Sequence, residues 1–184
     1  MISKTAVFFL LTVLLLGCGV SVDEDLISTQ PAPKLEFVEA RKAAALCAKH
    51  APDWAALEEA FKSAGYAKSK DPRLAGFARS TGTAVLDKAN TGMRVLVGEK
   101  NDQEGACIIG LEGMTPEQSF ALAQPWVGAF EAVTNAERGQ GLSQNAAQAW
   151  ASFEAERIIY IVAYKTWNVL FQPGAAVRLI YIER

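Results

Sequence analysis

The residues that could do nucleophilic or metal chemistry are few, and the closest pair lies in the tetrapeptide Cys47-Ala48-Lys49-His50. A thiol and an imidazole three residues apart could supply two metal ligands or a cysteine–histidine nucleophile pair. His50 is the single histidine of the chain, so the pair lacks the further ligands that a metal ion needs. We therefore predict no metal site and interpret His50 as a residue suited to the C-terminal end of a helix.

Acidic neighbours offer a second kind of chemistry. Glu58-Glu59 and the Glu154/Glu156 pair could be compared with the two carboxylates of a glycosidase. Those carboxylates face each other across a substrate, and proximity along the chain does not supply that geometry. We interpret both pairs as solvated edges of helices or strands, and we predict no catalytic residue among them.

Glycine-rich and serine-containing segments carry no nucleotide or hydrolase signature. The runs Gly76–Gly82 and Gly139-Gln140-Gly141 match neither a P-loop nor a dinucleotide-binding fingerprint. No serine lies in the pattern of a nucleophile elbow. The sequence thus predicts no cofactor and favours a non-enzymatic role, although it does not decide whether the chain is an enzyme.

The N-terminal segment has the layout of an export signal. Met1–Thr5 carries one positive charge, Lys4, and the apolar run Ala6–Leu16 follows. A positive start, a short apolar stretch and small residues at the cleavage site are typical of a secretory signal peptide. A membrane-spanning helix needs about 20 apolar residues, which is more than this run provides even when it is extended to Val20. A permanent N-terminal anchor helix is the weaker alternative.

The tetrapeptide Leu15-Leu16-Gly17-Cys18 ends this apolar run, and it resembles the lipobox of bacterial lipoprotein precursors. In that class the cysteine receives a diacylglyceryl thioether, and the precursor is cut just before it. The resemblance implies that residues 1–17 are a signal peptide and that Cys18 is the lipid attachment site. Leu16 departs from the usual pattern, because that place often holds a small or β-branched residue. An ordinary signal cut elsewhere and an apolar leader with an incidental cysteine remain as alternatives.

Lipidation of this kind implies a place for the protein. Several acyl chains on Cys18 would anchor the chain to a membrane, since one chain alone binds only marginally. Gly19 stands where an aspartate would resemble an inner-membrane retention signal, which favours an outer membrane facing the periplasm. Residues 18–34 hold an acidic cluster with Pro31 and Pro33, and a segment of this kind cannot bury enough apolar surface to fold. We expect it to be a flexible tether.

The remaining cysteines follow from this interpretation. If Cys18 carries lipid, Cys47 and Cys107 are an even pair in an oxidising compartment. We predict a disulfide bond between them. Two buried free thiols are the alternative, because cysteine packs well as a small hydrophobic residue.

The charge balance excludes one large class of partners. The whole chain has a net charge of −2, and loss of residues 1–17 removes one lysine, which leaves 17 basic and 20 acidic residues and a net charge of −3. An electrostatic nucleic-acid binder would show a basic stripe and a high pI. The charge balance therefore predicts no nucleic-acid partner. The resemblance to a lipobox implies a membrane partner through the N-terminal lipid, and an envelope protein or a cell-wall component is the further partner that we consider.

The pattern of apolar residues predicts an α+β fold for residues 35–184, which have the size of one domain. Helices are expected over 35–50, 53–65 and 115–130, with an ambiguous short helix over 145–155. Strands are expected over 83–87, 93–99, 106–111, 158–165 and 176–183, and loops over 66–76 and 135–144. The expected order is α-α-β-β-β-α-β-β, an antiparallel sheet of about five strands with the helices on one face. The final strand is apolar on both sides, so we place it in the middle of the sheet.

Two helices carry more detailed expectations. In the first, the side with Phe37 and Cys47 is the predicted core face. In the helix that begins with Thr115, threonine and Gln118 predict a capping box. The stripe predicted to face the core is Phe120, Ala123, Val127 and Phe130, and Pro125 is expected to kink or interrupt the helix.

The candidate binding surface lies in the connection between the last two strands. Trp167, Val169 and Phe171 would place apolar side chains on a loop, and exposed apolar side chains mark binding surfaces. The alternative is that this segment extends the strands or plugs the core.

These features together favour a membrane-anchored lipoprotein of the cell envelope that acts as a non-catalytic binding or structural module. Two other hypotheses remain open. One is an envelope enzyme that acts on cell-wall polymer, and the other is an inhibitor of a foreign hydrolase. The sequence does not identify the ligand, the partner or the oligomeric state.

Overall fold

The computed structural model describes residues 35–101, 104–134, 145–166 and 174–184. All of them belong to one compact unit that spans Ala32–Arg184. They form an antiparallel sheet with helices packed against it, so the predicted α+β class is confirmed.

Within the described residues the sheet contains eight strands, where the sequence predicted about five. In chain order they are β1 Tyr66–Lys68, β2 Thr83–Lys88, β3 Met93–Asn101, β4 Glu104–Leu111, β5 Val133–Thr134, β6 Ala146–Phe153, β7 Arg157–Tyr164 and β8 Ala176–Glu183. Their order across the sheet is β1-β2-β3-β4-β8-β7-β6-β5, and each described pair is antiparallel. β8 therefore lies between β4 and β7 in the middle of the sheet, which confirms the prediction made from its two apolar sides.

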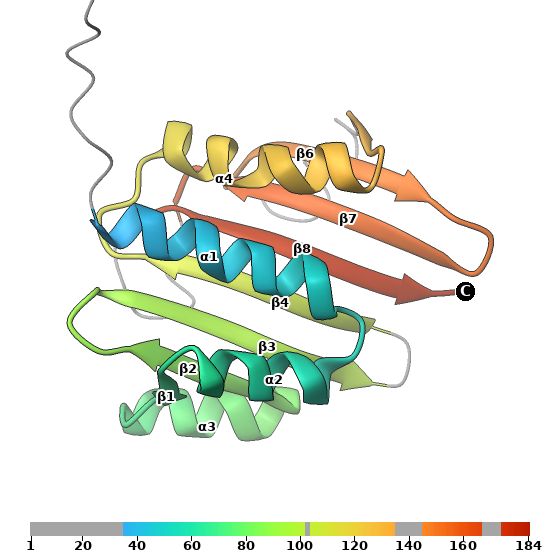
Figure 1. The fold of residues 1–184 in the computed structure, drawn as a ribbon. Helices are drawn as coiled ribbons and strands as arrows, with labels where there is room; N and C mark the ends of the chain where they lie inside the picture. The colour runs from blue at the N-terminus through green and yellow to red at the C-terminus, as the bar shows by residue number, and fades with distance from the viewer. Residues whose placement is uncertain (1–34, 102–103, 135–144, 167–173) are drawn as a thin grey trace, which may run out of the picture. The chain divides into compact units, whose positions relative to one another are not determined.

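Helices cover the two faces of the sheet unequally. The helices are α1 Leu35–His50, α2 Trp54–Ser63, α3 Pro72–Thr81 and α4 Pro116–Ala129. α1, α2 and α4 lie together on one face, and α3 lies behind the sheet in the same view (Figure 1). Alternate strand residues form two buried clusters, one against α1, α2 and α4 and one that includes Leu74 of α3. The single-face prediction holds for three helices, and α3 departs from it.

The disulfide joins α1 to the middle of the sheet. Cys47 in α1 and Cys107 in β4 are bonded, with their Cα atoms 6.2 Å apart, which is an ordinary separation for a disulfide. Both side chains are fully buried. This bond is compatible with the pairing expected from the sequence. Phe37 and Ala40 lie on the same buried side of α1, as its periodicity predicted.

α4 begins as predicted but turns a different side to the core. Thr115 and Gln118 form the capping box, with Thr115 Oγ1 accepting from the Gln118 N–H at 3.2 Å and Gln118 Oε1 accepting from the Thr115 N–H at 3.0 Å. The helix continues past Pro125 to Ala129. Ala123 of the predicted stripe is buried, and Val127 and Phe130 are partly buried against the core. The most buried side chains also include Leu122 and Trp126, and Phe120 is 45% exposed, so the predicted stripe is correct only in part.

Trp126 explains why α4 takes this orientation. Its indole is fully buried, and Nε1–H donates to the carbonyl oxygen of Ala44 in α1 at 2.8 Å. A buried indole generally needs such an acceptor. Phe120 lies at the edge of this buried side, and its ring centroid is 5.4 Å from the ring centroid of Trp150.

The segment 66–76, predicted to be a loop, contains β1 and the start of α3. Asp71 caps α3 by accepting from the Arg73 N–H, Pro72 occupies the first turn, and Gly82 ends the helix in the left-handed conformation. These are ordinary start and stop signals for a helix. The polar composition hid them, because only Leu74 of this helix is buried.

The segment 145–155, for which a short helix was favoured, is instead strand β6. Its alanines favour a helix, but pairing with β5 and β7 overrides that preference. Trp150 packs in the cluster beneath α1, α2 and α4, and Ala149 and Ala151 belong to the cluster on the other face. β6 thus places a large side chain, Trp150, on one buried face and the small side chains of Ala149 and Ala151 on the other buried face.

Candidate functional site

The residues that the sequence singled out are not brought together by the described structure. Cys18, Trp167, Val169 and Phe171 lie outside the described residues. Cys47 and Cys107 are joined in the core, and His50 is half-buried at the last position of α1. Within the described ranges there is no group of three or more His, Cys, Asp or Glu side chains that could hold a metal ion.

A concave site of a different kind lies near the edge of the sheet formed by β1 and β2. This hollow, which we call the edge slot, has a volume of about 650 Å³. Residues of α2 and α3 form its walls, and the first residues of β2 lie between them. The lining residues that matter below are Trp54, Ala55, Glu58, Ala75, Arg79 and Thr83. The volume falls within the range of ordinary ligand sites.

The fold builds the edge slot by ending β1 early. β1 pairs with β2 over only three residues, Tyr66↔Lys88 to Lys68↔Leu86. Ser69 adds one more backbone bond, from its N–H to the Val85 carbonyl at 2.9 Å, and the chain then leaves the sheet. The first half of β2 consequently pairs with β3 on one side and has no strand on its other side within the described structure.

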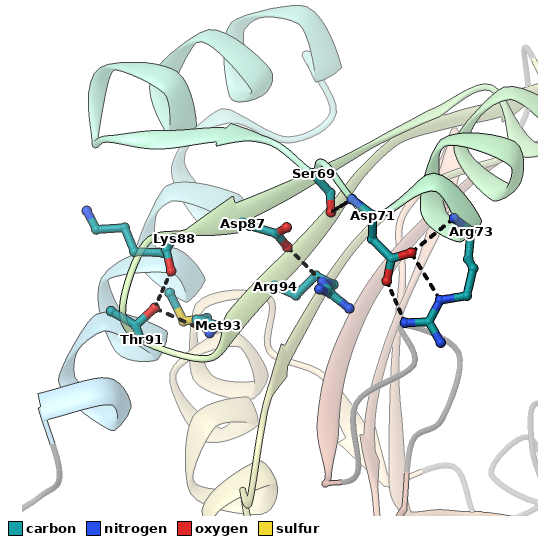
Figure 2. Close-up of polar contacts among 8 residues, drawn as sticks. All are labelled: Ser69, Asp71, Arg73, Asp87, Lys88, Thr91, Met93 and Arg94. Carbon is teal, nitrogen blue, oxygen red and sulfur yellow. Dashed lines mark hydrogen bonds and ion pairs between the residues drawn. The ribbon is translucent and has the colours of Figure 1, made fainter.

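A polar network holds the turn by which the chain leaves the sheet (Figure 2). Ser69 Oγ accepts from the Asp71 N–H at 3.3 Å, and both carboxylate oxygens of Asp71 accept from the Arg73 guanidinium, at 3.0 and 2.6 Å. The hydrogen bond from the Arg73 side chain lowers the pKa of Asp71 to about 2. Across the neighbouring strands, Arg94 Nε donates to Asp87 Oδ1 at 2.7 Å. Local polar contacts among residues 69–73 therefore hold the turn that leads into α3, and a separate ion pair joins β2 to β3.

The ionised groups of the slot suit binding better than proton transfer. Glu58 forms ion pairs with Lys62 at 3.0 Å and with Lys68 at 3.6 Å. The hydrogen bond from Lys62 is the main cause that lowers the pKa of Glu58, so this carboxyl stays ionised at neutral pH. Arg79 donates from Nε to the Ala75 carbonyl at 3.2 Å, and no described carboxylate is paired with it. With Glu58, Lys68 and Arg79 ionised, the lining carries one net positive charge.

Trp54 forms the inner end of the α2 wall, and a glycine makes room for it. A Cβ atom at Gly105 in β4 would lie 2.2 Å from the Trp54 indole, so only glycine allows the ring to lie against the strand. The Trp54 ring also meets Tyr181 edge-on, with centroids 5.9 Å apart. The position of Trp54 thus depends on the absence of a side chain at Gly105 in β4, two strands away from β2.

Gly105→Ala is expected to displace the Trp54 ring and to lower the free energy of unfolding by about 1–3 kcal/mol, the usual cost of overpacking. Urea unfolding would give the stability, and near-UV circular dichroism would report the lost packing of the indole. Gly128→Ala is the matched control, because a Cβ there meets nothing within 4 Å. It lies in α4 and should leave stability unchanged or raise it by up to about 1 kcal/mol. Equal stability of the two variants would contradict the packing described for Trp54.

A second hollow lies between α1 and α4. Its volume is about 830 Å³, its floor includes Trp126, and small side chains such as Ala45 and Ala121 form its walls. Arg41 and Lys49 stand on the α1 side. Residues of α1 and α4 alone line this groove. It therefore offers contact area but no strand edge to which a ligand could pair.

Comparison of the chain with known proteins identifies no relative. No family model, no curated protein and no solved structure matches the chain. Among the described residues, no helix is both long enough and apolar enough to cross a membrane. The chemical character of the edge slot therefore carries the functional interpretation.

Sequence reasoning missed the edge slot because its parts are far apart in the chain and individually ordinary. Trp54 is half-buried, and it both packs against the core and lines the slot. The available signal was Asp71-Pro72 with Gly82, which marks a helix between β1 and β2. A helix in this polar segment would have one side that packs against the sheet.

Proposed function

We propose that this chain is a lipid-anchored protein of the cell envelope, and that its α+β domain is a non-catalytic binding module with the edge slot as its ligand site. The lipid on Cys18 would hold the chain on the membrane, with the outer membrane facing the periplasm as the favoured place. Residues 18–34 would serve as the tether. The partner would be an envelope protein or a cell-wall component.

The observation that carries the binding role is the edge slot itself. It combines an aromatic ring, two small-residue walls and one net positive charge beside an uncovered stretch of strand. Its carboxylate is held ionised by lysines, which favours recognition of a ligand over acid–base catalysis. The resemblance of Leu15–Cys18 to a lipobox supports the anchor, and the buried Cys47–Cys107 bond is compatible with an oxidising compartment.

Photo-crosslinking in intact cells tests the binding role. Benzoylphenylalanine would replace Ala55 or Ala75, which are exposed residues on the two walls of the slot. Covalent adducts are expected at both positions. The matched controls are Glu59 in α2 and Gly76 in α3, which are exposed but do not line the slot. Adducts of equal yield at the control positions, or none at the slot positions, would contradict the proposal.

A further inference from the structure

The first half of β2 has no described strand on the side away from β3. One hydrogen bond shows which of its backbone groups point to that side. In an antiparallel sheet, the N–H and C=O of one residue point to the same neighbouring strand, and alternate residues point the same way. The Val85 carbonyl accepts from the Ser69 N–H, so the backbone groups of Val85 face away from β3. The register from Thr83↔Gly98 to Lys88↔Met93 is unbroken, so Thr83 has the same orientation as Val85.

Thr83 therefore presents its N–H and C=O to the edge slot, without a strand partner among the described residues. β1 ends at Lys68, which lies opposite Leu86, and Ser69 is the last residue that bonds to the edge. The four consecutive residues from Gly82 to Val85 line the slot. Unpaired backbone groups of this kind are what an additional strand would bind.

The two walls fit the alternating side chains of an extended chain. Side chains of directly opposite residues point to the same face of a sheet. Thr83 shares the face of Val85, on which α3 packs, so an added residue opposite Thr83 would point to the α3 wall. That wall consists of Leu74, Ala75, Ala78 and Arg79, and its guanidinium group favours an acidic residue. The next residue would point to Trp54 and Ala55 on the α2 wall.

We infer that the ligand of the edge slot is an extended peptide segment of a partner protein, which adds to the sheet as a short strand along Thr83 and carries an acidic group towards Arg79. The inference rests on the proposed binding function and names its ligand class. Main-chain bonds to Thr83 would give register, and the walls would give selectivity. Ala75 and Arg79 on α3 would select the side chains on one side of that strand, and Trp54 and Ala55 on α2 those on the other.

The test uses the mature full-length protein in detergent micelles and ten-residue peptides selected against it from a random display library. Selected peptides are expected to protect the Thr83 amide from hydrogen exchange. N-methylation of the one peptide residue that lies opposite Thr83 is expected to weaken binding by about tenfold or more, because it removes the N–H that would donate to the Thr83 carbonyl. N-methylation of the residue on either side of it should have little effect. Ala75→Trp, which fills the slot, should abolish binding, and Gly76→Trp on the same helix should not.

The outcomes separate this inference from the proposed function. Loss of binding in Ala75→Trp without a selective effect of N-methylation at the peptide residue opposite Thr83 would keep the slot as the ligand site and overturn strand addition. Equal binding by Ala75→Trp and Gly76→Trp would overturn both. Failure to select any peptide would overturn the peptide ligand, and the crosslinking adducts would then decide the binding role separately. Concentration-dependent dimerisation lost in Ala75→Trp would also overturn the inference, because the occupant would be a second copy of the chain.

Discussion

Replacement of both Cys47 and Cys107 by alanine is expected to lower the free energy of unfolding by about 4 kcal/mol. The bond closes a loop with a sequence separation of 60 residues, and in the chain-entropy model a loop of that size restricts the unfolded chain by about this amount. The loss is a large share of the ~5–15 kcal/mol that stabilises an ordinary domain. Urea unfolding of the variant and the parent, monitored by tryptophan fluorescence, would measure it.

Two controls isolate the bond from the packing of its sulfur atoms. The single variant Cys47→Ala should be about as unstable as the double variant, because either substitution removes the bond. The parent protein treated with a reductant should approach the same stability, and without reductant its denatured form should show no thiol from these two residues. A loss below about 1 kcal/mol in the double variant would contradict a stabilising disulfide.

Removal of the lipid proposed for Cys18 is expected to transfer the protein from the membrane to the soluble fraction almost completely. Each methylene buried in the bilayer contributes about 0.8 kcal/mol, and a diacylglyceryl group carries two long chains. The variant for this test is secreted with an ordinary cleavable signal peptide and begins at Gly19, so that no uncut leader holds it on the membrane. Fractionation of cells, followed by immunoblotting, would measure the distribution.

Cys18→Ser in the otherwise unchanged precursor is the companion variant. It should accumulate with its leader attached, because the lipid transfer that precedes cleavage cannot occur. If the protein that starts at Gly19 sediments with membranes as strongly as the parent does, the anchor lies elsewhere and the proposed role of Cys18 is wrong.

Much of the fold could be predicted where periodicity and composition agree. α1, with its alanines and its buried Phe37–Cys47 side, and the valine- and isoleucine-rich strands β7 and β8 were located to within a residue or two. β6 was not, because alanine favours helices and the strand pairing that overrides it joins segments distant in sequence. α3 was missed because one buried leucine gives no apolar stripe, although its capping residues were visible.

The site was harder to predict than the fold. The edge slot exists because β1 stops after Lys68 while β2 extends back to Thr83, and strand length at an edge leaves almost no trace in the sequence. Gly105 illustrates the same difficulty, since nothing near it in the chain indicates that the Trp54 ring packs on its backbone. Pairing of Cys47 with Cys107 was expected because they are the two cysteines that remain once Cys18 is assigned to lipid. The slot, in contrast, depends on the spatial arrangement of helices and strands.

The most direct test of the account is the intact mass of the native protein extracted from membranes of its own host. We predict a chain that begins at Cys18 and carries the added mass of a diacylglyceryl group, with or without a further amide-linked acyl chain. Fragmentation should place the added mass on Cys18. A chain that retains Met1, or one with an unmodified Cys18, would contradict the claim that this domain works as a lipid-anchored binding module.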